Sequence, residues 1–199
     1  MGVKRKNLDR LVSLGFNVHE YKEINTYDEL IEYSNINKQF TIRFDSIDEK
    51  NNLPFYMYDE SINLNKELYF EKIIKQMNDL HCTLLCSNGY KYDNKLLFNF
   101  VIDIDKNNNF ILELCSKKVP LRKMYEYKTT IIKGNIFDDY KNYSITNLKE
   151  NEYKEKDIKK IIDVIIDNDL KIKYLEGTFY EDNVGILNNK IIFWQTNIF

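Results

Sequence analysis

The sequence is poor in the residues that break a chain or cross-link it. Its 199 residues include only 6 Gly and 2 Pro, and no stretch has the composition of a flexible linker. The three cysteines (Cys82, Cys86 and Cys115) are an odd number, which favours a reducing compartment over a disulfide framework. We therefore predict one cytoplasmic domain over residues 1–199, and a division into subdomains 1–80 and 81–199 stays open.

Long apolar runs and an excess of either charge are also missing. No apolar run approaches the roughly 20 residues of a membrane helix, and the charged N-terminus lacks the apolar stretch of a secretory signal. The 29 basic and 31 acidic side chains give a net charge of −2, which offers no electrostatic footprint for duplex nucleic acid or an anionic membrane. We expect neither as a partner, although a local basic groove is compatible with this balance.

Apolar and aromatic residues are abundant, at 43 % and 14 % of the chain, so a packed core is expected. Apolar residues at helical spacing predict helices over residues 2–14, 26–33, 65–80 and 157–167. Thr26 with Glu29 forms a capping box, and Asn65 is placed to cap the third helix. The apolar face of that third helix is expected to hold Leu68, Tyr69, Ile73, Met77 and Leu80.

Alternating or β-branched stretches predict the strands, and turn residues lie between them. The expected strands cover residues 40–44, 82–86, 96–104, 110–115, 129–132, 172–179 and 191–196, and residues 16–24 are expected to form a loop or a short strand. Residues 106–109 are read as a hairpin tip, residues 88–89 as a turn, and residues 181–183 as the turn of a last hairpin. Helices and strands do not alternate strictly, so we predict an α+β fold of mostly antiparallel sheets with flanking helices.

The first candidate site is the basic N-terminal turn. Gly2 is followed by Lys4, Arg5 and Lys6 at the start of the first predicted helix. Backbone N–H groups at a helix start attract anions, and a lysine adds a point charge for phosphate. A basic turn in solvent is the plain alternative.

Arg43 is the second candidate, in the middle of an alternating strand. Its apolar neighbours fix the backbone, so the guanidinium is expected on the other face, where it can form a fork to phosphate oxygens. A pair with Asp45 or with a helix carboxylate is an equally open reading.

The last hairpin supplies the third candidate. Glu176 lies on one predicted strand and Gln195 on the other, so a carboxylate and an amide oxygen face each other. Hard oxygen ligands of this kind suit Mg²⁺. An ordinary cross-strand polar pair is the alternative.

Taken in chain order, these fragments resemble the ATP-binding domain of pyruvate phosphate dikinase and phosphoenolpyruvate synthase, an ATP-grasp family. GVKRKNL at residues 2–8 and LGFNV at residues 14–18 are similar to its G-x-K-x-x-N-L and L-G-[LF]-x-V-P motifs. TIRFDS at residues 41–46 is similar to its V-R-S strand. LEG at residues 175–177 and FWQT at residues 193–196 resemble its I-E-F and L-Q-T-R pair.

The resemblance implies a compact ATP-grasp-like domain that binds ATP with Mg²⁺. Lys4 and Arg43 would hold the phosphates and serve catalysis, and Glu176 with Gln195 would hold the metal. The strand over residues 84–88 would border the adenine, which makes contacts of Leu85 and Ser87, and Glu113 would contact the ribose or the metal. Such a protein would transfer a phosphoryl group to a small molecule or a partner protein, as an ATP-dependent phosphotransferase or ligase.

The chain also departs from the family pattern. Tyr174 stands where the family has an acid two residues before the metal-binding Glu, His19 replaces a Pro, and Asn197 replaces a final Arg. Losing one acid weakens metal-assisted chemistry more than it weakens binding. A non-catalytic module that binds a nucleotide, a nucleic-acid strand or a protein is therefore the alternative function, and the many tyrosines would give it stacking surfaces.

Overall fold

The computed structural model describes residues 2–47, 53–63, 65–88, 96–116, 129–147, 155–168, 172–180 and 191–198. The chain divides into two compact units. The first unit comprises Met1–Lys6 and His19–Asn94, and the second comprises Asn7–Val18 and Lys95–Phe199. We describe each unit by itself.

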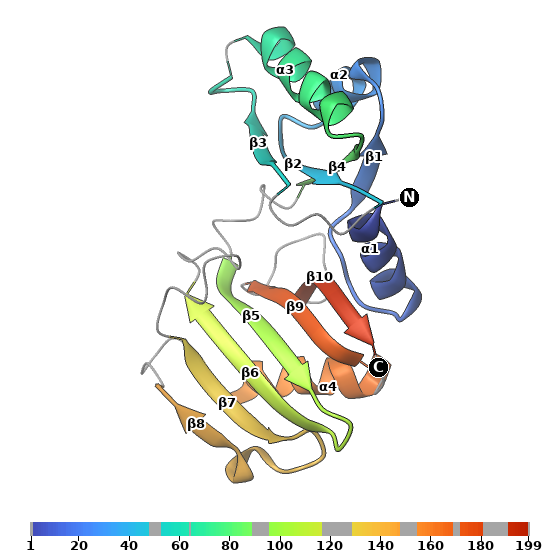
Figure 1. The fold of residues 1–199 in the computed structure, drawn as a ribbon. Helices are drawn as coiled ribbons and strands as arrows, with labels where there is room; N and C mark the ends of the chain where they lie inside the picture. The colour runs from blue at the N-terminus through green and yellow to red at the C-terminus, as the bar shows by residue number, and fades with distance from the viewer. Residues whose placement is uncertain are drawn as a thin grey trace. The chain divides into compact units, whose positions relative to one another are not determined.

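The first unit is an antiparallel sheet with two helices on one face (Figure 1). The order across this first sheet is β1-β4-β2-β3, and every pair of neighbouring strands is antiparallel. Its strands are β1 (Tyr21–Ile24), β2 (Gln39–Asp45), β3 (Phe55–Asp59) and β4 (Thr83–Ser87), and its helices are α2 (Tyr27–Ile36) and α3 (Lys66–Asp79).

The caps that the sequence predicts for these two helices are confirmed. Thr26 and Glu29 form a reciprocal capping box at the start of α2, and the Asn65 side chain accepts the Leu68 N–H at the start of α3. The predicted apolar face of α3 is wrong at Leu68, which is 63 % exposed. The buried stripe is Phe70, Ile73 and Met77, because these positions share one side of the helix.

Helix α1 (Val3–Ser13) has its first turn in the first unit and the rest in the second. The helix stops just before Gly15, as expected. Gly15 has a φ of 82°, the left-handed conformation that glycine adopts most easily. Buried Leu11 and Phe16 join the core of the second unit, where the Phe16 ring stands edge-on to Phe193.

The second unit is a six-stranded antiparallel sheet in the order β10-β9-β5-β6-β7-β8. Its strands are β5 (Leu96–Ile104), β6 (Asn109–Ser116), β7 (Thr130–Asn135), β8 (Ser144–Thr146), β9 (Ile172–Tyr180) and β10 (Ile191–Ile198). A short 3-10 helix, η3 (Tyr140–Asn142), precedes β8, and the helix α4 (Glu155–Asn168) packs on the sheet. In the described part of the chain, no helix is long and apolar enough to cross a membrane.

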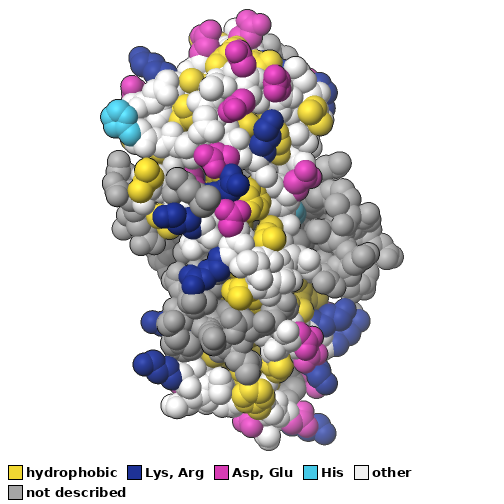
Figure 2. Space-filling view, turned by 90° about the vertical axis from the view of Figure 1, so that its right-hand side faces the viewer, with side chains coloured by type: hydrophobic (Ala, Val, Ile, Leu, Met, Phe, Trp, Pro, Cys, Tyr) yellow, Lys and Arg dark blue, Asp and Glu magenta, His cyan; other side chains and the backbone are white. Residues whose placement is uncertain are grey.

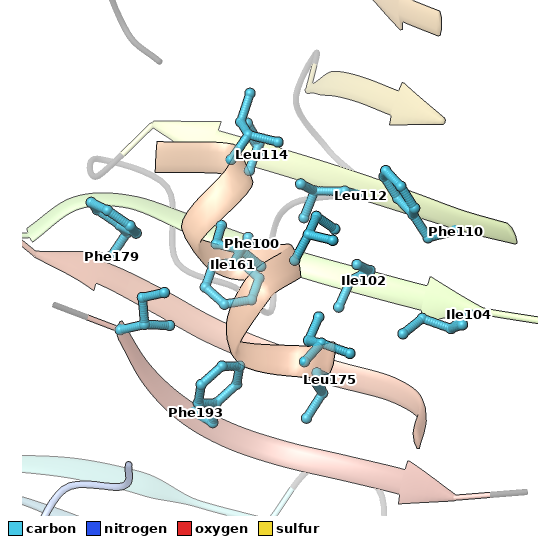
Figure 3. Packing of buried hydrophobic residues seen from close by; sticks show 14 of the residues in the cluster. Phe100, Ile102, Ile104, Phe110, Leu112, Leu114, Ile161, Leu175, Phe179 and Phe193 are labelled. Atoms are coloured by element: carbon cyan, nitrogen blue, oxygen red, sulfur yellow. The ribbon is translucent and has the colours of Figure 1, made fainter. Parts of the chain in front are cut away.

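The core of this unit lies between α4 and one face of the second sheet (Figure 3). Ile161 of α4 faces Phe100 of β5 and Leu175 of β9, all of them fully buried. The β5–β6 hairpin turns at residues 106–109 as predicted, with Asn108 at a φ of 63°. The predicted turns at 88–89 and 181–183 lie wholly or partly outside the described residues.

The observed architecture is α+β with antiparallel sheets and flanking helices, as the sequence predicts. Two strands were not predicted. β3 has apolar residues on both of its faces, so its sequence shows no alternation of apolar and polar residues, and β8 has only three residues.

Candidate functional site

The residues predicted to bind a nucleotide and metal fall into two groups, one in each unit. Lys4, Arg43, Leu85 and Ser87 belong to the first unit, whereas Glu113, Glu176 and Gln195 belong to the second. Within each unit, these residues come from neighbouring strands or from the start of α1.

Arg43 occupies the middle of β2, on the face of the first sheet that α2 and α3 leave uncovered. Its neighbours Ile42 and Phe44 point to the helices and are fully buried, as the alternation of the strand predicts. Arg43 stands between Leu85 of β4 and Phe55 of β3 in the strand register. Its guanidinium carbon lies 5.7 Å from the centre of the Phe55 ring, which limits the orientations of the side chain.

Leu85 and Ser87 lie on β4 beside β2 and are both buried. The Ser87 hydroxyl is 2.8 Å from the Thr41 hydroxyl, which also donates to the Ser87 carbonyl oxygen at 3.2 Å. The apolar side chain of Leu85 and the polar side chain of Ser87 therefore lie beside Arg43 on the same face of the sheet.

The N–H groups at the start of α1 bind a carboxylate of the protein itself. Asp45, which is 2 % exposed, accepts the backbone N–H of Lys4 at 2.8 Å and that of Arg5 at 3.0 Å. Gly2 packs so closely against this carboxylate that a Cβ there would lie 2.1 Å from Asp45 Cγ. Asp45 therefore fills the anion position that helix starts favour.

The Lys4 ammonium lies next to the same strand end and donates to the Phe44 carbonyl oxygen at 2.6 Å. Burial lowers the pKa of Lys4, and the charge of Arg43 lowers it further, against the opposing effect of Asp45. The next residue, Arg5, pairs with Glu23 at 2.7 Å. Lys4 and Arg5 are thus held against β2 and β1, respectively, whereas Lys6 is exposed.

His19 is buried near Arg43, and it was not among the predicted site residues. Burial, with a smaller contribution from the charge of Arg43, lowers the pKa of His19 to about 4. The imidazole is therefore neutral at physiological pH.

The second group forms a row across the second sheet. Val101 of β5 is paired with Glu113 of β6 on one side and with Glu176 of β9 on the other. The backbone register of the last hairpin sets Gln195 of β10 opposite Glu176, as the sequence predicts. Glu113 and Glu176 are half-buried on the face that α4 leaves uncovered.

Each carboxylate in this row has a hydroxyl partner. The Thr129 hydroxyl donates a long hydrogen bond of 3.5 Å to Glu113, and the Tyr174 hydroxyl donates a short one to Glu176 Oε1. Burial raises the pKa of Tyr174, and the hydrogen bond to Glu176 and the nearby carboxylates raise it further. Tyr174 therefore keeps its proton and acts as a donor.

The carboxylate of Glu176 in this row is available to bind a cation. Among the described residues, no lysine or arginine forms an ion pair with Glu176. No group of three or more His, Cys, Asp or Glu in the described part of the chain could hold a metal alone. Figure 2 shows basic and acidic side chains interspersed over the visible face, without a broad surface of one sign.

Sequence reasoning missed Asp45 as the helix cap and Tyr174 as the partner of Glu176. The signal for Tyr174 was present, since residues two apart on a strand share a face. The signal for Asp45 was not, because the contact joins residues 41 positions apart.

No protein-family model matches this sequence, and no curated protein matches it either. Solved structures do match. D-alanyl-alanine synthetase A from Vibrio cholerae aligns over 98 % of this chain with a TM-score of 0.52 and 8 % identity. A RiPP-associated ATP-grasp ligase from Chryseobacterium gregarium, solved with ADP and a leader and core peptide, aligns over 98 % with a TM-score of 0.50 and 12 % identity. D-cycloserine synthetase aligns over 98 % with a TM-score of 0.51 and 8 % identity.

These similarities establish the fold. The chain has the ATP-grasp fold, which confirms the broader part of the sequence-based resemblance. It spans 55 %, 51 % and 61 % of the three matched chains, in the order given above.

Proposed function

We propose that this chain binds ATP with Mg²⁺ as an ATP-grasp protein and transfers the γ-phosphoryl group to an acceptor, in the manner of a ligase. The observation that carries the proposal is the fold shared, over 98 % of the chain, with an ATP-grasp ligase solved with ADP and with two synthetases. The acceptor is a small molecule or a partner peptide or protein, and the leader and core peptide bound by the Chryseobacterium ligase favours a peptide.

In this proposal, the first unit binds the phosphates and the base. Arg43 presents a guanidinium with a fixed stem, which suits a bidentate contact with phosphate oxygens. Lys4 lies beside the same strand and adds positive charge, while Leu85 and Ser87 offer an apolar and a polar contact for the adenine. Positioning and charge neutralisation are the main contributions that a protein makes to phosphoryl transfer.

The second unit would hold the metal. Mg²⁺ in nucleotide sites is bound by one or two carboxylates together with phosphate oxygens and water, so a full set of protein ligands is not required. Glu176 fits this requirement as a half-buried carboxylate without a cation partner among the described residues, and Gln195 is its neighbour in the register. Mg²⁺ bound there would neutralise charge on the triphosphate, and Glu113 would contact the ribose or the metal.

The closer resemblance to the pyruvate phosphate dikinase branch is also a proposal. It depends on the short motifs around Lys4, Arg43, Glu176 and Gln195. Tyr174 in place of an acid is the departure that bears most on catalysis.

The test is the effect of ATP on thermal stability with and without Mg²⁺. A ligand at 100 times its Kd stabilises a protein by about 2.7 kcal/mol, which gives an easily measured rise in Tm. We expect Mg²⁺-ATP to raise Tm in the wild type and to lose most of this effect in Arg43→Ala and Lys4→Ala. The quantity compared is the ATP-induced shift, because Lys4→Ala also removes a hydrogen bond of the folded protein.

Lys38→Ala is the matched control, because Lys38 is an exposed lysine of the same unit that pairs with Glu60. It should keep the full ATP-induced shift. If saturating ATP changes neither Tm nor calorimetric heat in the wild type, the proposed function is wrong. Tight binding without any release of ADP during long incubation would instead identify a non-catalytic nucleotide-binding module.

A further inference from the structure

We infer that Tyr174 is a positioning residue, which holds the Glu176 carboxylate in the orientation that binds the metal. The inference rests on the proposed function, since it assigns Glu176 to Mg²⁺. It gives a role to Tyr174, which stands where the family pattern has an acid.

The geometry of β9 brings the two side chains together. Tyr174 and Glu176 are two residues apart on one strand, so both point to the face that α4 leaves uncovered. The Tyr174 hydroxyl reaches along the strand and donates to Glu176 Oε1. Oε2 of the carboxylate is thereby left for another ligand.

This hydrogen bond restricts a side chain that would otherwise rotate. An unrestrained Glu loses rotamer entropy when it is fixed, and a partner that fixes it in advance removes part of that cost from metal binding. In the described part of the chain, the Tyr174 hydroxyl is the only hydrogen-bond partner of the Glu176 side chain, and no basic side chain forms an ion pair with it.

The surrounding charges explain why a neutral donor suits position 174. Asp103 lies directly opposite Tyr174 in the register, and Glu113 is paired with Val101, the residue opposite Glu176. A fourth carboxylate, at position 174, would repel both Asp103 and Glu176. A phenol instead orients Glu176 without adding negative charge, and it leaves the second carboxylate oxygen for the cation.

The test compares Tyr174→Phe with the wild type in Mg²⁺ titrations of the full chain in the presence of a non-hydrolysable ATP analogue. Calorimetry measures the affinity, and the fluorescence of the single tryptophan, Trp194, next to Gln195 in the sequence, gives a second readout. Loss of a group that orients a metal ligand costs 10–100-fold in metal affinity, so we expect Mg²⁺ to bind about 10-fold more weakly. The affinity for the analogue without Mg²⁺ should stay unchanged, which a general structural defect would not allow.

Tyr143→Phe is the matched control. Its hydroxyl also belongs to the second unit but donates to the Asp138 carbonyl oxygen, away from the row of carboxylates. It should leave Mg²⁺ affinity unchanged, and Glu176→Gln should abolish Mg²⁺ dependence. If Glu176→Gln has that effect and Tyr174→Phe binds Mg²⁺ as tightly as the wild type, the role of Tyr174 is overturned while the proposed function stands. If the wild type binds no nucleotide, the proposed function fails and this inference fails with it.

Discussion

At the scale of single residues, the two histidines of the chain have different surroundings. His19 is 5 % exposed and has a pKa lowered to about 4 by burial and by Arg43, whereas His81 is exposed. Above pH 6.5 His19 is neutral in both the folded and the unfolded chain, so it adds no pH dependence there. Below that pH the unfolded chain binds a proton that the folded chain does not.

We therefore predict that the free energy of unfolding falls as the pH is lowered from 6.5 towards 4. The loss from this one group approaches roughly 3 kcal/mol at the acid end. Urea unfolding at a series of pH values measures it, and His19→Asn should flatten the curve in this window.

His81→Asn is the control for this pH dependence. His81 is exposed and has a φ of 50°, a conformation that asparagine tolerates, so the same substitution can be made there without disturbing the backbone. A wild-type protein and a His19→Asn variant with parallel pH curves would contradict the prediction.

At the scale of elements, α1 begins on a buried carboxylate. Asp45 accepts two backbone N–H groups that no residue of the helix itself can satisfy. We predict that Asp45→Ala lowers the free energy of unfolding by about 1–2 kcal/mol, because the helix loses its cap. Asp45→Asn should cost less, since an amide oxygen still accepts one N–H group.

Chemical denaturation followed by circular dichroism measures both substitutions. Asp163→Ala on the exposed side of α4 is the control and should change stability by no more than about 0.5 kcal/mol. An Asp45→Ala variant as stable as this control would mean that the N–H groups of α1 are satisfied without the carboxylate.

The elements that could be predicted from the sequence were those marked by residues close to one another in the chain. The capping box at Thr26 and the strand around Arg43 were predicted from residues within a few positions of each other, and both are confirmed. The strand β3 was missed because its outward-facing residues Phe55 and Met57 are apolar although they are 41 % and 46 % exposed, so no alternation of apolar and polar residues marks the strand. The cap of α1 was missed because Asp45 is distant in the sequence.

At the scale of the whole molecule, the two faces of each sheet differ in the same way. Helices cover one face of each sheet and bury its apolar residues, while Arg43 in one unit and Glu176 in the other lie on the opposite faces. The sequence could suggest which face each residue takes, since that follows from alternation along a strand. It could not establish that both residues serve one ligand, because that depends on tertiary structure, and this part of the site stays a prediction.

Hydrogen exchange with and without nucleotide tests whether both units bind the same ligand. We predict that Mg²⁺ with a non-hydrolysable ATP analogue slows amide exchange in β2 and β4 of the first unit and in β9 and β10 of the second, because ligand binding suppresses local opening. Arg43→Ala should lose the protection in both units together, since either group of contacts alone binds the nucleotide more weakly. Lys38→Ala should keep it. Protection confined to one unit, in the wild type at saturating ligand, would mean that the nucleotide is bound by that unit alone and that the residues of the other serve a different purpose.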